Sequence, residues 1–214
     1  TAVALLALLA LASCSLLTTE RVDCASNAQC IELFGSGHTC KPDGFCGPVP
    51  LDPRCDPWPE DLLSAPDKHR KAIVFGSLMD RANETKVARQ QSMQLAIQQA
   101  GDELEGRHFA LLRCTIEDNE ALYPDVQIVA QTAEAEASKE QVVAENLALH
   151  LTRDFDVPVL LGPSSSSITS AVNSVLRGAY ETTLVISPSA TSPMLTQEDE
   201  TEPSNEHPGL LWRT

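Results

Sequence analysis

Two segments rich in serine and threonine are the parts of this sequence best suited to chemistry. They are residues 162–167 (GPSSSS) and residues 186–193 (ISPSATSP). Hydroxyl groups both donate and accept hydrogen bonds, and free backbone N–H groups at the start of a helix favour an anion. Pro188 and Pro193 restrict the second segment, which lowers the cost of ordering it on binding. The pattern predicts a site for a carboxylate, although serine runs are also common in ordinary loops and helix caps.

The elements around these segments predict an α/β fold. Apolar runs typical of strands alternate with helical patterns, so we expect a parallel sheet with helices on both faces. Ligands of such sheets bind at the carboxyl ends of the strands, where both serine-rich segments would lie. The expected strands are residues 72–78, 108–115, 157–161 and 182–187, and the expected helices are residues 85–100, 138–155 and 167–178.

The helix expected over residues 138–155 has the clearest pattern. Val143, Leu147 and Leu151 recur at a spacing of four, which places them on one face. Ser138 is a suitable N-cap, with Gln141 in the capping-box position.

The serine-rich segments together resemble the leucine/isoleucine/valine-binding family of periplasmic type 1 binding proteins. A glycine with serines opens a helix, ISPSATSPMLT follows, and residues 211–214 (LWRT) resemble the family's next segment. The resemblance covers roughly residues 70–214, the first of the two lobes of such proteins. It implies that Ser166, the backbone of Ser189, and Thr191 hold the head group of an amino acid, with Ser165 as a neighbour in the serine run.

Three features depart from the family plan. Residues 79–83 (MDRAN) lack the glycine-rich turn often found there, the second lobe is missing, and a cysteine-rich segment is added. We therefore expect the 214 residues to be an N-terminal fragment with an incomplete lobe at residues 71–214. Because closure around a ligand needs two lobes, residues 57–214 alone should bind weakly or not at all. Submillimolar affinity would contradict this expectation.

The N-terminus resembles a truncated lipoprotein signal peptide. Residues 2–12 are apolar but shorter than the about 20 residues of a membrane-spanning helix. They have the length of a signal-peptide core, and residues 11–14 (LASC) resemble a lipobox. We expect residues 1–13 to be removed and Cys14 to carry lipid, so that the membrane holds the chain by this anchor only. An ordinary cleavage site beside an incidental cysteine is the alternative.

Six further cysteines indicate disulfides in an exported protein. Residues 14–56 contain few large apolar side chains, so cross-links would replace a core there, and residues 57–70 read as a linker. The pairing is open, since four cysteines allow three arrangements. Zinc is the alternative, but the spacing fits poorly and we expect no metal. Cys55 and Cys114 either pair or leave Cys114 as a buried thiol. The remaining four cysteines are Cys24, Cys30, Cys40 and Cys46.

The net charge of -15 argues against nucleic acid as a partner. The sequence has no nucleophile elbow, zinc-binding His-Glu motif or phosphate loop, and its five histidines are scattered. We expect surface histidines, no enzyme activity and no cofactor. The resemblance implies a lipoprotein on the periplasmic side of a bacterial envelope, which delivers an amino acid or similar carboxylate to an ABC permease. The alternatives are a ligand-sensing receptor of the same fold and an envelope interaction lipoprotein.

Overall fold

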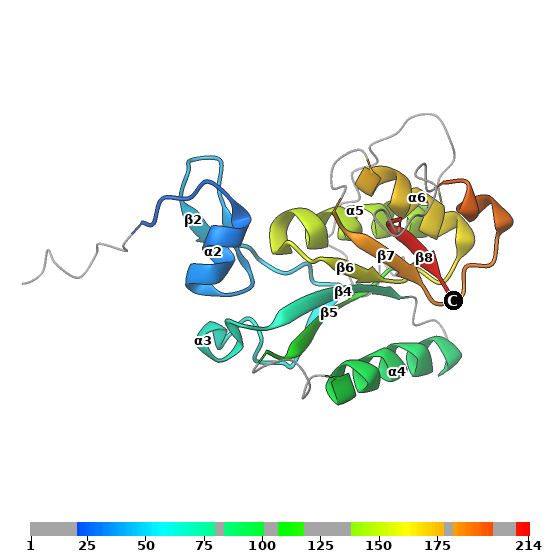
Figure 1. Ribbon diagram of the computed structural model, residues 1–214, viewed down its shortest axis with the longest axis horizontal. Helices are drawn as coiled ribbons and strands as arrows, with labels where there is room; N and C mark the ends of the chain where they lie inside the picture. The colour runs from blue at the N-terminus through cyan, green and yellow to red at the C-terminus, as the bar shows by residue number, and fades with distance from the viewer. Residues whose placement is uncertain (1–20, 80–83, 101–106, 118–137, 178–181, 199–208) are drawn as a thin grey trace, which may run out of the picture.

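A six-stranded sheet forms the centre of the computed structural model, which describes residues 21–79, 84–100, 107–117, 138–177, 182–198 and 209–214 (Figure 1). The strand order is β3-β5-β4-β6-β7-β8. Only β3 runs antiparallel to its neighbour, and the other pairs are parallel. This confirms the α/β class. The strands are β3 (Cys55–Trp58), β4 (Ile73–Met79), β5 (Phe109–Thr115), β6 (Val159–Leu161), β7 (Leu184–Ser187) and β8 (Leu211–Arg213).

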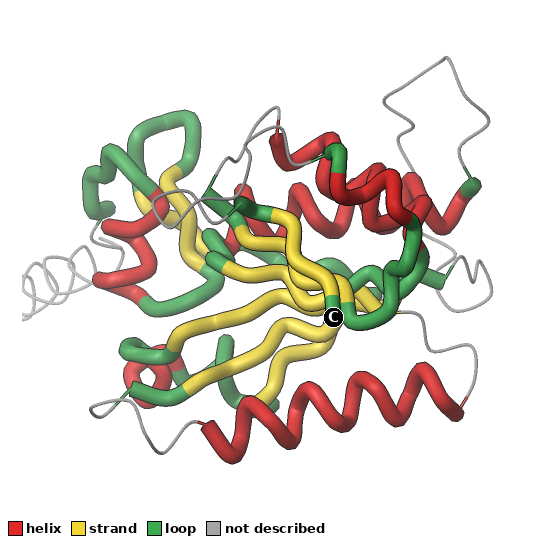
Figure 2. Tube along the Cα trace, turned by 45° about the vertical axis from the view of Figure 1, so that its right-hand side comes forward, coloured by secondary structure: helices red, strands yellow, loops and turns green. Residues whose placement is uncertain are grey.

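Helices cover both faces of the sheet, as predicted (Figure 2). Helices α5 (Lys139–Phe155) and α6 (Ser166–Arg177) lie on one face, and α4 (Glu84–Ala100) lies on the other. The Ser138 hydroxyl accepts a hydrogen bond from the Gln141 N–H, which confirms the predicted cap of α5. The predicted apolar face of α5 is buried in the main core, which contains Leu78, Val143, Leu147, Leu151, Leu160 and Val172.

Gly76 in β4 makes room for leucine side chains of β6 and α5. A Cβ atom at Gly76 would lie 2.5 Å from Leu160 Cδ2 and 2.9 Å from Leu151 Cδ1. An added Cβ atom would therefore require the side chains of Leu160 and Leu151 to shift.

The cysteine-rich segment folds into a small module of its own. It contains α2 (Asn27–Phe34), β1 (His38–Cys40) and β2 (Cys46–Pro48), with disulfides Cys24–Cys40 and Cys30–Cys46. The sulfurs of Cys24, Cys30 and Cys40 lie within 4.8 Å of one another, but all three are in disulfides and so are not free thiolate ligands.

The structure places the start of the expected linker in the sheet instead of between two units. Residues 55–58 form β3, an edge strand, and the Cys55–Cys114 disulfide joins it to β5 where these two residues are in register. The short helix α3 (Pro66–His69) follows. Proline-rich composition favours a linker, but an antiparallel edge strand tolerates Pro57, because an edge has fewer ladder hydrogen bonds to make.

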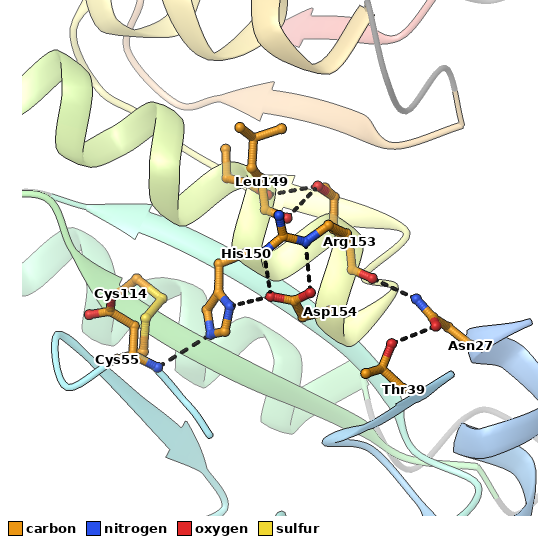
Figure 3. A network of polar contacts seen from close by, with 11 residues as sticks. Asn27, Thr39, Cys55, Cys114, Leu149, His150, Arg153 and Asp154 are labelled. Atoms are coloured by element: carbon orange, nitrogen blue, oxygen red, sulfur yellow. Dashed lines mark hydrogen bonds and ion pairs between the residues drawn. A yellow bond between two sulfur atoms is a disulfide. The ribbon is translucent and has the colours of Figure 1, made fainter. Parts of the chain in front are cut away.

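Polar contacts dock the cysteine module onto α5 (Figure 3). Asn27 Nδ2 donates to the Arg153 carbonyl oxygen at 2.6 Å. The Asp52 N–H donates to His150 Nε2 at 3.3 Å, so His150 Nδ1 carries the proton that is shared with Asp154 Oδ2 at 2.7 Å. The expectation of a surface histidine is therefore wrong for His150, which is half-buried.

A second histidine cluster anchors α3 to the sheet, and it also corrects the expectation of surface histidines. His69 is only 4% exposed. Its Nδ1 lies 2.9 Å from His108 Nε2, and its Nε2 lies 2.8 Å from Asp61 Oδ1. Lys68 donates to the other Asp61 oxygen at 2.6 Å. The cluster forms because a buried imidazole needs polar partners, which Asp61 before α3 and His108 before β5 supply.

This cluster predicts a loss of stability on mild acidification. Burial lowers the pKa of His108 below its ordinary value of 6.5, and the neighbouring His69 lowers it further. The unfolded chain therefore binds a proton at His108 at higher pH than the folded chain does. The free energy of unfolding should fall as the pH drops through about 6.5. The pKa of Asp61 is also lowered, by its hydrogen bonds with Lys68 and His69, and that contribution is lost only at lower pH.

Urea denaturation at about pH 7.5 and about pH 5.5 tests the effect. In His108→Gln, the decrease in the free energy of unfolding between the two pH values should be smaller than in the unmodified chain. An equal decrease in both proteins would show that His108 does not contribute.

The predicted signal peptide and Cys14 lie outside the described residues. Among the helices that the structure describes, none is both long and apolar enough to cross a membrane.

Candidate functional site

The two serine-rich segments lie against each other at the carboxyl ends of β6 and β7. Ser187 Oγ donates to the Pro163 carbonyl oxygen at 2.6 Å, and Ser189 Oγ donates to the Ser164 carbonyl oxygen at 3.1 Å. The Ser192 N–H donates to Ser166 Oγ at 3.1 Å, just before the 3-10 helix η2 (Pro193–Thr196). The serines therefore fasten the two loops to each other as well as presenting hydroxyl groups.

Gly162 allows the first loop to turn sharply after β6. Its φ is +97°, and a Cβ atom there would lie 2.2 Å from the Leu78 carbonyl oxygen at the end of the neighbouring strand. Its N–H donates to the Ile186 carbonyl oxygen at 2.8 Å. Only glycine fits this combination of backbone angle and contact, because it has no Cβ atom.

A pocket of about 350 Å³ opens beside the first loop. This volume is within the range of about 300–1,000 Å³ that is usual for small-molecule sites. The pocket lies where α4, α5 and α6 begin and where β5 ends, so segments far apart in the sequence contribute to it. The described residues that line it are Lys86, Arg89, Ile116, Ser138, Glu140, Ser164, Ser165, Ser167 and Ile168.

The pocket has the electrostatics of an anion site. Helices α5 and α6 both begin at it, and the start of a helix carries a partial positive charge from its free N–H groups. Lys86 and Arg89 add two cationic side chains from the first turns of α4, and Glu140 of α5 adds one carboxylate. Arg89 Nη1 donates to Ser189 Oγ at 3.1 Å, which holds the guanidinium between α4 and the second serine-rich loop. This local positive charge occurs in a chain whose net charge is -15.

The four residues for which the family resemblance implied ligand contacts differ in their positions relative to the pocket. Ser165 lines the pocket, and its hydroxyl lies 3.0 Å from that of Ser167. Ser189 reaches the pocket through its side-chain bond with Arg89. Ser166 accepts the bond from Ser192, and neither Ser166 nor Thr191 is among the described residues that line the pocket. Thr191 is exposed.

Sequence reasoning missed the charged residues of the pocket. Lys86 and Arg89 belong to a helix with a weak apolar pattern. Charged residues of such a helix are usually interpreted as facing solvent. Ser138 was recognised only as a cap, and Glu140 follows it in the first turn of α5. The order of strands and helices along the chain could have indicated where these charged residues lie. Since α4 follows β4, its first turns must lie at the same edge of the sheet as the serine-rich loops.

Comparison with known proteins gives matches among solved structures only. No protein-family model matches the chain, and no curated protein matches it. A branched-chain amino acid transporter substrate-binding protein, LivJ from Streptococcus pneumoniae, in complex with isoleucine, is similar with a TM-score of 0.46 and 19% identity over 67% of this chain. A solute-binding protein of an ABC transporter from R. palustris, in complex with 4-hydroxybenzoate, is similar with a TM-score of 0.43 and 12% identity over 66% of this chain. The matches span 33% and 31% of those two proteins.

Proposed function

We propose that this chain binds a small solute that carries a carboxylate, an amino acid or a similar acid, in the pocket at the start of α4, α5 and α6. One observation carries the proposal: serine hydroxyls, two cationic side chains and the starts of two helices meet at a single pocket of about 350 Å³. Each of these groups favours a carboxylate, and together they surround it with hydrogen-bond donors.

The biological role that we propose follows from the sequence resemblance. In this role, the chain is the first lobe of a periplasmic type 1 binding protein that delivers its ligand to an ABC permease. Lipid on Cys14 would hold it on the periplasmic side of a bacterial membrane. The disulfides of the cysteine module are in keeping with an oxidising compartment outside the cytosol.

We propose binding without catalysis. The described lining residues include four serines but no histidine or cysteine that could act as base or nucleophile beside them. The hydroxyl of Ser165 lies beside that of Ser167, which is no general base. Such a hydroxyl can donate a hydrogen bond to a ligand.

A nuclear magnetic resonance titration of the isotope-labelled 214-residue chain tests this function. Because one lobe alone should bind only weakly, each common amino acid would be added at up to about 100 mM. Its C-terminal amide would be the matched compound without the carboxylate. We expect the amino acids to shift the backbone signals of Ser164, Ser165 and Ser167, with smaller shifts for the amides. Unchanged signals at all three serines with every amino acid would overturn the proposal.

Two serine variants test the role of Ser165 directly. Ser165 lies just before α6, and the control residue Ser170 lies within it. Ser165→Ala should weaken binding roughly fivefold to tenfold, because it removes a donor to a charged group. Ser170→Ala is the matched control. Ser170 donates to Glu198 at 2.6 Å and does not line the pocket, so its removal should leave the affinity unchanged. Equal affinities in the two variants would remove Ser165 from the site.

A further inference from the structure

The charges of the pocket indicate which class of carboxylate it takes. Its described lining contains two cations, Lys86 and Arg89, and one carboxylate, Glu140. Among the described lining residues, two side chains are apolar, those of Ile116 and Ile168. A ligand with a large apolar side chain would therefore meet mainly charged and hydroxyl groups, which lose hydration without gaining a partner.

Arg89 is the best placed of the charged groups. It is half-buried, and its bond from Nη1 to Ser189 Oγ fixes the direction of the guanidinium. Ser189 is in turn fixed by its bond to the Ser164 carbonyl oxygen. A guanidinium has five N–H donors in a planar fork that fits a carboxylate, and the bond to Ser189 occupies one of them. Arg89 is thus held in place to contact a carboxylate without losing side-chain freedom on binding.

The serines and the starts of α5 and α6 form a second group of donors, independent of the α4 side chains. A ligand with a single carboxylate at these donors would give Arg89 no anionic partner. Because binding displaces water from the pocket, the guanidinium would then lose hydration without compensation, which costs free energy. A second carboxylate on the same ligand removes that cost. Glu140 then provides the one negative charge that an ammonium group requires.

We propose that the pocket binds an acidic amino acid, of the aspartate and glutamate class. This ligand has one carboxylate for Arg89, a second for the serine hydroxyls and the helix starts, and an ammonium group for Glu140. The proposal rests on the proposed function and narrows its ligand. This ligand class differs from the apolar amino acids for which the leucine/isoleucine/valine-binding family, which the sequence resembles, is named.

Titrations of the 214-residue chain with L-glutamate, L-glutamine and L-leucine test this ligand class. We expect glutamate to bind roughly tenfold more tightly than glutamine, which is isosteric but lacks the second charge, and leucine to bind more weakly than glutamate. In Arg89→Gln, the affinity for glutamate should fall to about that for glutamine. Arg70→Gln is the control, because it removes the same charge just before the amino end of β4, outside the described lining of the pocket, and it should keep the preference.

Glu140→Gln tests the ammonium contact separately. It should weaken the binding of glutamate but not of glutarate, which has two carboxylates and no ammonium group. Glutamine or leucine binding as tightly as glutamate, or an unchanged preference in Arg89→Gln, would overturn the acidic ligand class while leaving solute binding intact. A complete lack of binding by every amino acid would instead overturn the proposed function.

Discussion

Replacing both Cys55 and Cys114 by alanine should lower the free energy of unfolding by about 4 kcal/mol. The disulfide joins residues separated by 59 positions, so its loss greatly increases the freedom of the unfolded chain. It also releases the edge strand β3 from β5 at a fully buried position, since Cys114 is 0% exposed. Because domains of this kind are stable by only about 5–15 kcal/mol, the variant should unfold at a much lower urea concentration.

The matched control is the double replacement of Cys24 and Cys40 by alanine. Their separation is 16 positions, and both lie in the small module, so the main unfolding transition of the sheet should change little. Circular dichroism during urea denaturation distinguishes the two variants. An unchanged transition midpoint without the Cys55–Cys114 disulfide would show that β3 is held by other contacts.

Gly162→Ala should reduce stability by about 3 kcal/mol or more and also abolish ligand binding. The added Cβ atom would meet the Leu78 carbonyl oxygen at 2.2 Å, and the φ of +97° is one that L side chains rarely adopt. The first serine-rich loop must therefore move away from β4, and with it Ser164 and Ser165. Thermal unfolding and ligand titration of the same variant measure both effects.

Gly44→Ala is the matched control for backbone strain alone. Gly44 has a similar φ of +81°, but nothing lies within 4 Å of the Cβ atom that alanine would add. It should cost only about 1–2 kcal/mol and leave binding intact. If Gly162→Ala behaves like Gly44→Ala, the close contact with β4 does not position the loop.

The regular part of the fold could be predicted from the sequence. The expected strand at residues 108–115 corresponds to β5 (Phe109–Thr115), and the expected helix at residues 167–178 corresponds to α6 (Ser166–Arg177). These elements follow local patterns of apolar residues, which burial on a parallel sheet imposes. β3 was missed because its pairing depends on a partner far along the chain, β5, and its composition is that of a loop.

The candidate site was predictable only in part, for the same physical reason. Serine-rich loops at strand ends are visible in the sequence, and Ser165 lines the pocket, while its contact with a ligand stays a prediction. The positions of Arg89 and Glu140 depend on how α4 and α5 are set against the sheet, which no local pattern encodes. The contact between Arg89 and Ser189 joins residues a hundred positions apart.

A crystal structure of the 214-residue chain grown with millimolar L-glutamate tests the central claim most directly. We expect glutamate in the pocket between α4, α5 and α6. One carboxylate should lie within hydrogen-bond distance of the Arg89 guanidinium, and the other should lie at the hydroxyl groups of Ser165 and Ser167. Glutamate bound elsewhere on the chain, with this pocket filled by water alone, would contradict the account.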